Sequence, residues 1–228
     1  RAGDRDCAAT LEEALGCDVV TLHVPLIREG PDRTYHLLGE EELDLLRPGT
    51  ILINASRGAV IDNLALAAAL RRRPDLKVWL DVFEGEPELR VPQLLELCEG
   101  CTMHIAGHSL EFKHRAVACL ARALSDALGL PRPPSLPLPP TELAPFDLKG
   151  VRAVDEVLAG RLMRAVYDVA ADAAAFKRGY SGASSFDRLR NGYPPRRECL
   201  ALPLVNVPEE LAPALAALGF NPSGSAQL

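Results

Sequence analysis

The sequence contains 228 residues, 48% of them hydrophobic, which is enough for one large or two smaller domains with buried cores. Its formal net charge of -6 argues against a general nucleic-acid binder, because such proteins neutralise phosphates with Lys and Arg. No apolar run approaches the roughly 20 residues that span a bilayer, and the N-terminus has no signal-peptide layout. We therefore expect a cytoplasmic protein that contacts neither nucleic acid nor a membrane.

Strand and helix patterns alternate through the first half of the chain. Strands are expected at 18–26, 50–54, 76–83 and 102–106. Helices are expected at 11–15, 40–46, 63–73, 91–97 and 109–128. Strands and helices at this spacing indicate βαβ units with right-handed crossovers. The predicted fold class is α/β, a Rossmann-like doubly wound parallel sheet of which this chain contains a part.

A proline-rich stretch at 131–145 is the clearest predicted domain boundary, because such sequences form extended, semi-rigid linkers. Beyond it, helices are expected at 155–166, 186–190 and 208–218 and a strand at 200–207, which indicates a small α+β domain. The predicted organisation is therefore a domain at 1–108, a long helix at 109–130, a linker at 131–145 and a second domain at 146–228.

The six cysteines are too scattered for the disulfide framework of a small secreted domain, and we expect reduced thiols. Cys98 and Cys101 form a C-x-x-C motif, and His104 follows at a spacing that a zinc ligand could have. No second cysteine pair completes such a site, and a turn between a helix and a strand is the favoured interpretation. We predict no metal.

Arg57 follows the apolar strand at 50–54, with Asn54 and Gly58 placed to turn the chain. Ligands of open parallel sheets bind beyond the carboxyl ends of the strands, where a guanidinium can hold a carboxylate through two parallel hydrogen bonds. Taken alone, such an arginine is more often a structural ion-pair partner. Asp62 and Asn63 can cap the helix that follows.

Asp81, Glu86 and His104 also lie at or just beyond predicted strand ends. Moving a hydride from a carbon that bears a hydroxyl requires a base for the hydroxyl proton, and a histidine suits that role near neutral pH. Glu86 could orient the histidine, and Asp81 could accept hydrogen bonds from a cofactor amide. Each also has an ordinary structural interpretation: His104 as a satisfied core residue, Glu86 as part of a solvated turn and Asp81 as a cap. His23 and His36 have no comparable setting and are interpreted as structural.

Four arginines, Arg188, Arg190, Arg196 and Arg197, cluster around an Asn-Gly-Tyr-Pro-Pro turn. A solvated basic turn is the default interpretation. An anion site and a contact between subunits remain open.

The segments LHVPL, ILINASRGAVIDN, LDVFEGEPEL and HIAGHSLE, in this order and spacing, resemble the D-isomer-specific 2-hydroxyacid dehydrogenases. The resemblance implies that Arg57 binds the substrate carboxylate, that His104 is the acid/base and that Glu86 is its partner. It implies an NAD cofactor whose nicotinamide end is lined by Ala55, Ser56, Arg57, Asp81 and Gly107, with His108 near the substrate. It also implies a small phosphorylated hydroxy acid as substrate and a homodimer formed through the C-terminal domain.

Three departures from the family pattern limit this assignment. The family's G-x-G-x-x-G turn has no counterpart in these residues, so we expect the chain alone to bind NAD poorly and not to turn over. Val24 stands where a threonine is usual, and His108 stands where close relatives carry a tyrosine. The alternatives are a sister dehydrogenase acting on 3-phosphoglycerate or glycerate, a dinucleotide-sensing interaction protein, and a remnant without activity.

Overall fold

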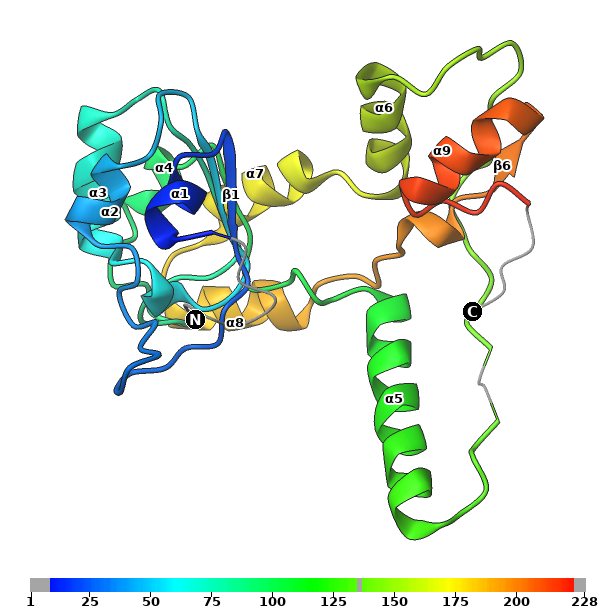
Figure 1. Cartoon of the computed structure of the whole chain (residues 1–228), viewed down its shortest axis with the longest axis horizontal. Helices are drawn as coiled ribbons and strands as arrows, with labels where there is room; N and C mark the ends of the chain where they lie inside the picture. Colours follow the sequence, from blue (N-terminus) through cyan, green and yellow to red (C-terminus); the bar gives the residue numbers. More distant parts are fainter. Residues whose placement is uncertain (1–8, 135–136, 224–228) are drawn as a thin grey trace. The chain divides into compact units, whose positions relative to one another are not determined.

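The computed structural model describes residues 9–134 and 137–223, which form two compact units (Figure 1). Unit 1 combines residues 9–106 with Ala170–Tyr193, and unit 2 combines Gly107–Val169 with residues 194–223. The division differs from the predicted domain boundaries, because a segment from the second half of the chain joins unit 1. The proline-rich stretch lies inside unit 2, where Arg197 Nη1 donates to the carbonyl oxygens of Pro139 and Pro140, both at 3.2 Å.

Unit 1 is built on a parallel four-stranded sheet in the order β1-β2-β3-β4. Its strands are β1 (Val19–Leu22), β2 (Ile51–Asn54), β3 (Lys77–Leu80) and β4 (Gly100–Cys101). Val19 pairs with Ile51 and Ile51 with Lys77, so the first three strands start level with one another and end at the same edge. The predicted parallel α/β sheet is confirmed.

In the first half of the chain the helices of unit 1 follow the predicted alternation with the strands, and two further helices come from the second half. They are α1 (Leu11–Leu15), α2 (Glu40–Asp44), the 3-10 turn η1 (Gly58–Val60), α3 (Asn63–Arg72), α4 (Leu94–Leu97), α7 (Val169–Gly179) and α8 (Ala183–Asn191). The Asp62 carboxylate accepts from the backbone N–H groups of Leu64 and Ala65, at 2.9 and 3.1 Å, and so starts α3 as expected.

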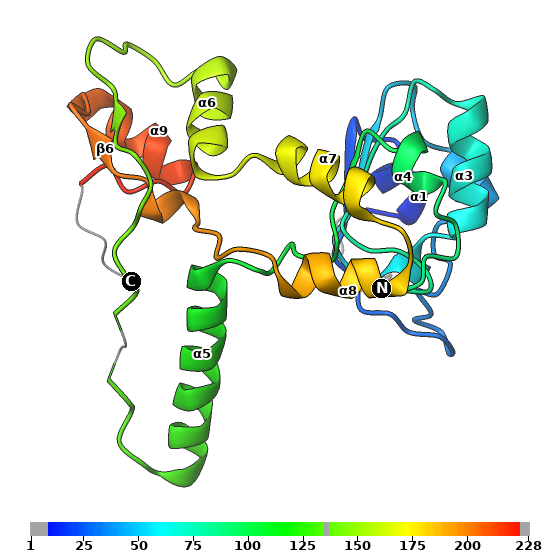
Figure 2. The same ribbon diagram turned by 180° about the vertical axis from the view of Figure 1, so that it is seen from behind.

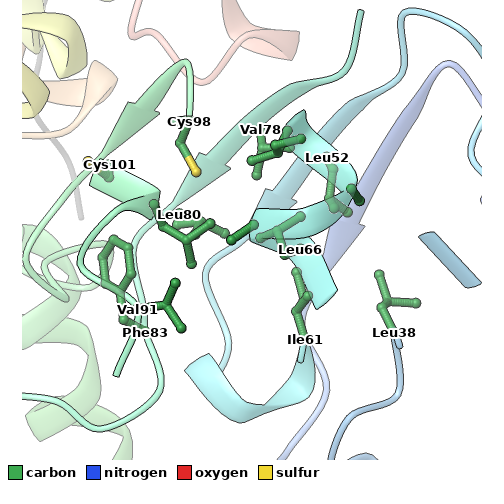
Figure 3. Packing of buried hydrophobic residues seen from close by; sticks show 14 of the residues in the cluster. Leu38, Leu52, Ile61, Leu66, Val78, Leu80, Phe83, Val91, Cys98 and Cys101 are labelled. Atoms are coloured by element: carbon green, nitrogen blue, oxygen red, sulfur yellow. The ribbon is translucent and has the colours of Figure 1, made fainter. Parts of the chain in front are cut away.

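The core of unit 1 lies where the strands meet the helices (Figure 3). Leu52, Val78 and Leu80 point from the sheet toward Leu66 of α3, and all four are at most 2% exposed. Cys98 and Cys101 belong to the same core, at 3% and 1% exposed. Burial raises the pKa of the Cys98 thiol above its usual range and that of Cys101 to about 11. Both are therefore neutral thiols near pH 7, which suits a packing role rather than thiolate chemistry.

The predicted strand at 102–106 is wrong, because β4 occupies Gly100–Cys101 and ends there. The following residues wrap around the Asp81 carboxylate instead of continuing the ladder. Asp81 accepts from the Thr102 hydroxyl at 2.6 Å and from the N–H groups of Ile105 and Ala106 at 2.8 and 2.9 Å. These bonds replace the strand pairing that would otherwise satisfy the backbone.

The helix α7 was not predicted, and together with α8 it packs on unit 1 (Figures 1 and 2). Phe176 of α7 is 0% exposed and lies 5.7 Å, ring centroid to centroid, from Phe186 of α8. Both rings belong to the core that also contains Phe83. Burying these aromatic side chains is what draws the segment to unit 1.

Unit 2 contains one long helix and a small α+β cluster. Its elements are α5 (Leu110–Leu128), β5 (Phe146–Asp147), α6 (Glu156–Val166), η2 (Cys199–Ala201), β6 (Leu204–Val205), η3 (Glu209–Leu211) and α9 (Ala212–Ala217). The strand predicted at 200–207 is reduced to β6, which pairs in parallel with β5. The helix predicted at 208–218 is divided between η3 and α9. Within the described residues, no helix is long and apolar enough to cross a membrane.

The four clustered arginines have separate environments. Arg197 Nε donates to the buried Glu111 carboxylate at 2.7 Å, and the Arg196 guanidinium lies 4.4 Å from the Tyr167 ring centroid, both within unit 2. Arg190 belongs to unit 1 and is half-buried, whereas Arg188 on the same helix is exposed. The solvated basic turn therefore describes Arg188 but not the other three.

Candidate active site

The predicted site residues of unit 1 lie beyond the ends of three neighbouring parallel strands. Arg57 follows β2, Asp81 and Glu86 follow β3, and His104 follows β4. Because these strands run in the same direction, the segments emerge at one edge of the sheet, where ligands of open α/β sheets bind.

Arg57 is held by a turn that Asn54 organises. The buried Asn54 side chain accepts from the Ser56 N–H at 3.0 Å and from the Ser56 hydroxyl at 2.7 Å, and it donates to the Arg57 carbonyl at 3.1 Å. Arg57 Nη1 donates to the Ser56 carbonyl at 2.7 Å. The side chain is otherwise exposed, and among the described residues its Nε and Nη2 have no protein partner. Those donors can hold a carboxylate.

Gly58 brings the Arg57 turn into contact with the segment that carries Glu86. A Cβ atom at this position would lie 1.9 Å from the Phe83 carbonyl carbon and 2.5 Å from the Glu84 nitrogen. Only a residue without a side chain allows this approach. The requirement couples the position of Arg57 to the start of the Glu86 turn.

Glu86 and His104 form a hydrogen-bonded pair. The Glu86 carboxylate lies 2.7 Å from His104 Nδ1, and its other oxygen accepts from the Phe83 N–H at 2.6 Å. Glu86 is 18% exposed and His104 33%. A carboxylate on Nδ1 selects the tautomer with the proton on that nitrogen, so Nε2 is left to accept a proton. No protein group in the described residues bonds to Nε2.

His104 sits in a backbone conformation that sequence patterns did not indicate. Its φ is 57°, in the left-handed region, which a non-glycine residue adopts at some cost. Its N–H donates to the Asp81 carbonyl at 2.8 Å, and its carbonyl accepts from Arg190 Nε at 3.0 Å. The backbone of His104 is therefore fixed on both sides.

A second network near the site was missed by the sequence analysis. Asn63 and Glu84 bond reciprocally: the Asn63 N–H donates to Glu84 Oε2 at 3.2 Å, and the Glu84 N–H donates to Asn63 Oδ1 at 3.0 Å. His36, interpreted as structural, lies between Glu84 at 2.7 Å and Asp62 at 3.3 Å. A carboxylate two residues before the catalytic candidate carried no separate signal in the sequence.

The structure brings some of the predicted residues together and separates others. Glu86 and His104 are bonded, and Asp81 anchors the His104 turn. The Ser56 hydroxyl is engaged by Asn54, so its predicted contact with a cofactor would have to be made in another way. Gly107 and His108 belong to unit 2, and their predicted roles stay predictions.

The parallel sheet of unit 1 has the fold of an NAD-binding domain, as the comparison with protein families shows. Residues 3–106 match the model of the D-isomer specific 2-hydroxyacid dehydrogenase, NAD binding domain, which confirms the resemblance seen in the sequence. Residues 137–219 match a domain of unknown function, DUF3410.

The particular relatives are erythronate-4-phosphate dehydrogenases. The chain is 46% identical to the enzyme of Azotobacter vinelandii over 90% of its own length and 56% of the relative's, and 45% identical to that of Edwardsiella ictaluri over 90% and 54%. It thus spans about half the length of the curated relatives it matches. A solved D-lactate dehydrogenase from Aquifex aeolicus, complexed with NAD and lactic acid, is 29% identical, with a TM-score of 0.42 over 53% of this chain and 41% of that one.

Proposed function

We propose that this chain belongs to an NAD-dependent dehydrogenase acting on 4-phospho-D-erythronate and that it contains the acid/base pair of the active site. The product would be 2-oxo-3-hydroxy-4-phosphobutanoate, formed by oxidation at C2 in vitamin B6 biosynthesis. The observation that carries the proposal is the Glu86–His104 pair, bonded at 2.7 Å through Nδ1. The substrate is inferred from the names of the relatives. Their similarity extends over 90% of this chain, which supports assigning the same substrate here.

His104 accepts the proton of the C2 hydroxyl on Nε2, and Glu86 stabilises the imidazolium that forms. Arg57 holds the substrate carboxylate through its outward donors and places positive charge near the oxygen that becomes a carbonyl. The Asn54 turn holds the Arg57 backbone, so the guanidinium starts from a fixed position.

The residues present fit the nicotinamide end of NAD. A carboxylate offers about four acceptor positions, and Asp81 uses three, so its Oδ2 can accept one more bond, from a carboxamide N–H. When bound, NAD supplies the acceptor for the hydride from C2. Ala55, Ser56, Arg57 and Gly107 are proposed to line the same end, and His108 is proposed to contact the substrate.

We also propose a cytoplasmic homodimer formed through the C-terminal region. Val157 and Met163 of α6 are 69% and 43% exposed, and a second copy would cover such apolar side chains. Sedimentation of the complete protein tests this part independently of activity. A monomer at micromolar concentration would contradict it.

The function is tested on the complete protein that contains this chain, by nicotinamide absorbance with 4-phospho-D-erythronate, 3-phospho-D-glycerate and D-glycerate as parallel substrates. We expect a strong preference for the phosphorylated four-carbon acid. In Arg57→Ala, kcat/KM should fall by about 100-fold or more, and Arg57→Lys should not restore it, because an ammonium lacks the two parallel donors. Arg71→Ala, on the exposed side of α3, is the matched control and should stay near the wild-type rate.

Other outcomes lead to other conclusions. Preference for a different acid would keep the mechanism and change the substrate. No oxidation of any of the three acids would favour a dinucleotide-sensing protein and would overturn the proposed function.

A further inference from the structure

The hairpin of α7 and α8 (169–191), hereafter the C-terminal hairpin, lies in the region that matches a domain of unknown function but packs on the NAD-binding domain. Phe176 is fully buried and lies 6.0 Å, centroid to centroid, from Phe83, which is three residues before Glu86. The ring of Tyr180 packs on Phe176 in turn, at 5.8 Å. The hairpin is thus anchored at the start of the segment that carries the catalytic carboxylate.

The hairpin also bonds to the end of that segment. The Leu89 N–H donates to the Tyr180 hydroxyl at 2.9 Å, and the Ala183 N–H, at the start of α8, donates to the Glu88 carboxylate at 2.8 Å. Glu88 and Leu89 follow Glu86 by two and three residues. The Glu86 turn is therefore fixed on its far side by groups of the hairpin.

The other end of α8 bonds to the partner of Glu86. Arg190 Nε donates to the His104 carbonyl at 3.0 Å. A guanidinium is a charged donor, so this bond is stronger than one between neutral groups. It acts on a residue whose left-handed backbone conformation needs support from its surroundings.

One helix therefore bonds both to His104 and to Glu88, which follows Glu86 by two residues. Ala183 and Arg190 are seven residues apart on α8, which is about 10 Å along a helix axis. A helix transmits this spacing rigidly, so α8 sets where the Glu86 turn lies relative to the His104 turn. We propose that the C-terminal hairpin is a positioning element of the dehydrogenase site and that Arg190 is its positioning residue for His104; this rests on the function proposed above.

The test compares two variants of Arg190, one of Arg188 and one of Tyr180. Arg190→Ala removes the donor, Arg190→Lys keeps a cationic donor, and Arg188→Ala removes an exposed arginine from the same helix. Tyr180→Phe removes the hydroxyl that accepts from Leu89 while keeping the buried ring. Hydrogen exchange of residues 104–106 is measured in each, because the Ile105 and Ala106 amides report on the His104 turn through their bonds to Asp81. Initial rates are measured on the complete protein.

We expect Arg190→Ala to speed exchange at 104–106 by about 10-fold and to lower kcat by about 10- to 100-fold, since a small misplacement of a reacting group is costly. KM should stay within about 3-fold, because Arg190 does not touch the substrate. Arg190→Lys should recover most of kcat, Tyr180→Phe should lower kcat by a smaller factor, and Arg188→Ala should change neither readout.

Unchanged exchange at 104–106 in Arg190→Ala would overturn the proposal, as would faster exchange with an unchanged kcat. An equal effect of Arg188→Ala would also overturn it, because the cause would then be helix charge. If the complete protein oxidises no 2-hydroxy acid, the proposed function fails, and the exchange measurement still decides whether Arg190 fixes the His104 turn.

Discussion

Two carboxylate–histidine pairs lie in unit 1 with the same separation and different environments. Glu86 and His104 are 2.7 Å apart, and so are Glu84 and His36. In the second pair the other ring nitrogen lies 3.3 Å from Asp62, and the Glu84 side chain is 6% exposed. In the first pair the second ring nitrogen has no protein partner in the described part of the chain.

The comparison shows that the hydrogen bond alone does not make a histidine an acid/base. His36 joins the loop before α2 to the starts of α3 and the Glu86 segment. Both of its ring nitrogens contact carboxylates, so neither is available to a substrate. His104 uses one nitrogen in its bond to Glu86, and the other is the nitrogen that accepts the proton in the proposed mechanism. The two carboxyl-bearing residues beside His36 could suggest a metal site, since the ligand atoms of His36, Asp62 and Glu84 lie within 4.8 Å of one another. Each of these side chains already bonds to another, which accounts for the cluster without an ion.

The substitution Glu86→Gln should have the largest effect on kcat and should distinguish the two pairs most clearly. Gln can keep the geometry but can no longer stabilise an imidazolium or fix its tautomer, so kcat of the complete protein should fall by about 100- to 10,000-fold. The free energy of unfolding should change by less than about 1 kcal/mol, because the side chain is partly solvated. Stopped-flow or steady-state rates and urea unfolding measure the two quantities. A kcat close to that of the wild type would show that the pair is structural.

The same substitution at Glu84 should have the opposite pattern. The buried carboxylate bonds to His36 and to the Asn63 N–H, and charged hydrogen bonds of this kind contribute about 1 to 3 kcal/mol to stability. Glu84→Gln should therefore lower the free energy of unfolding by about that amount, with kcat within about 3-fold below the unfolding temperature. A stable Glu84→Gln variant with a large loss of kcat would place Glu84 in the catalytic machinery and end the distinction.

The smallest effect concerns a carboxylate far along the sheet from both pairs. The Arg73 guanidinium and the Gly49 N–H lower the pKa of Asp75 from 3.8 to about 2. Because the folded-state pKa is depressed, the contribution to stability is present above about pH 4 and is lost as the pH falls through about 2. NMR titration of the Asp75 carboxyl should show the low pKa, and Arg73→Ala should return it toward 3.8. An unchanged titration in the variant would assign the shift to another group.

Local patterns predicted much of unit 1. The helical and strand segments around Arg57, including the cap at Asp62, followed from residue type and spacing, since each depends on neighbours in sequence. The strand at 102–106 failed because the Asp81 carboxylate competes for those backbone groups, a contact across 21 or more residues. Hydrophobic spacing carries no sign of such a contact.

The residues proposed to act in the site were easier to predict than the residues that surround and position them. Arg57, Glu86 and His104 were singled out by residue type and by resemblance. Arg190 was noted only as one of four clustered arginines and Glu84 was not noted, because their roles arise from packing between segments up to 86 residues apart. The aromatic residues Phe176, Tyr180 and Phe186 were the available signal for the C-terminal hairpin, and they indicate burial without saying against which surface.

The most direct test of the account exchanges the two histidines for glutamine and measures both rate and stability of each variant. His104→Gln should lower kcat of the complete protein by about 100-fold or more while the free energy of unfolding changes by about 0.5 kcal/mol or less. His36→Gln should lower the free energy of unfolding by about 1 to 3 kcal/mol and leave kcat within about 3-fold. A His104→Gln variant that keeps its rate, or a stable His36→Gln variant that loses it, would contradict the assignment of catalysis to the Glu86–His104 pair.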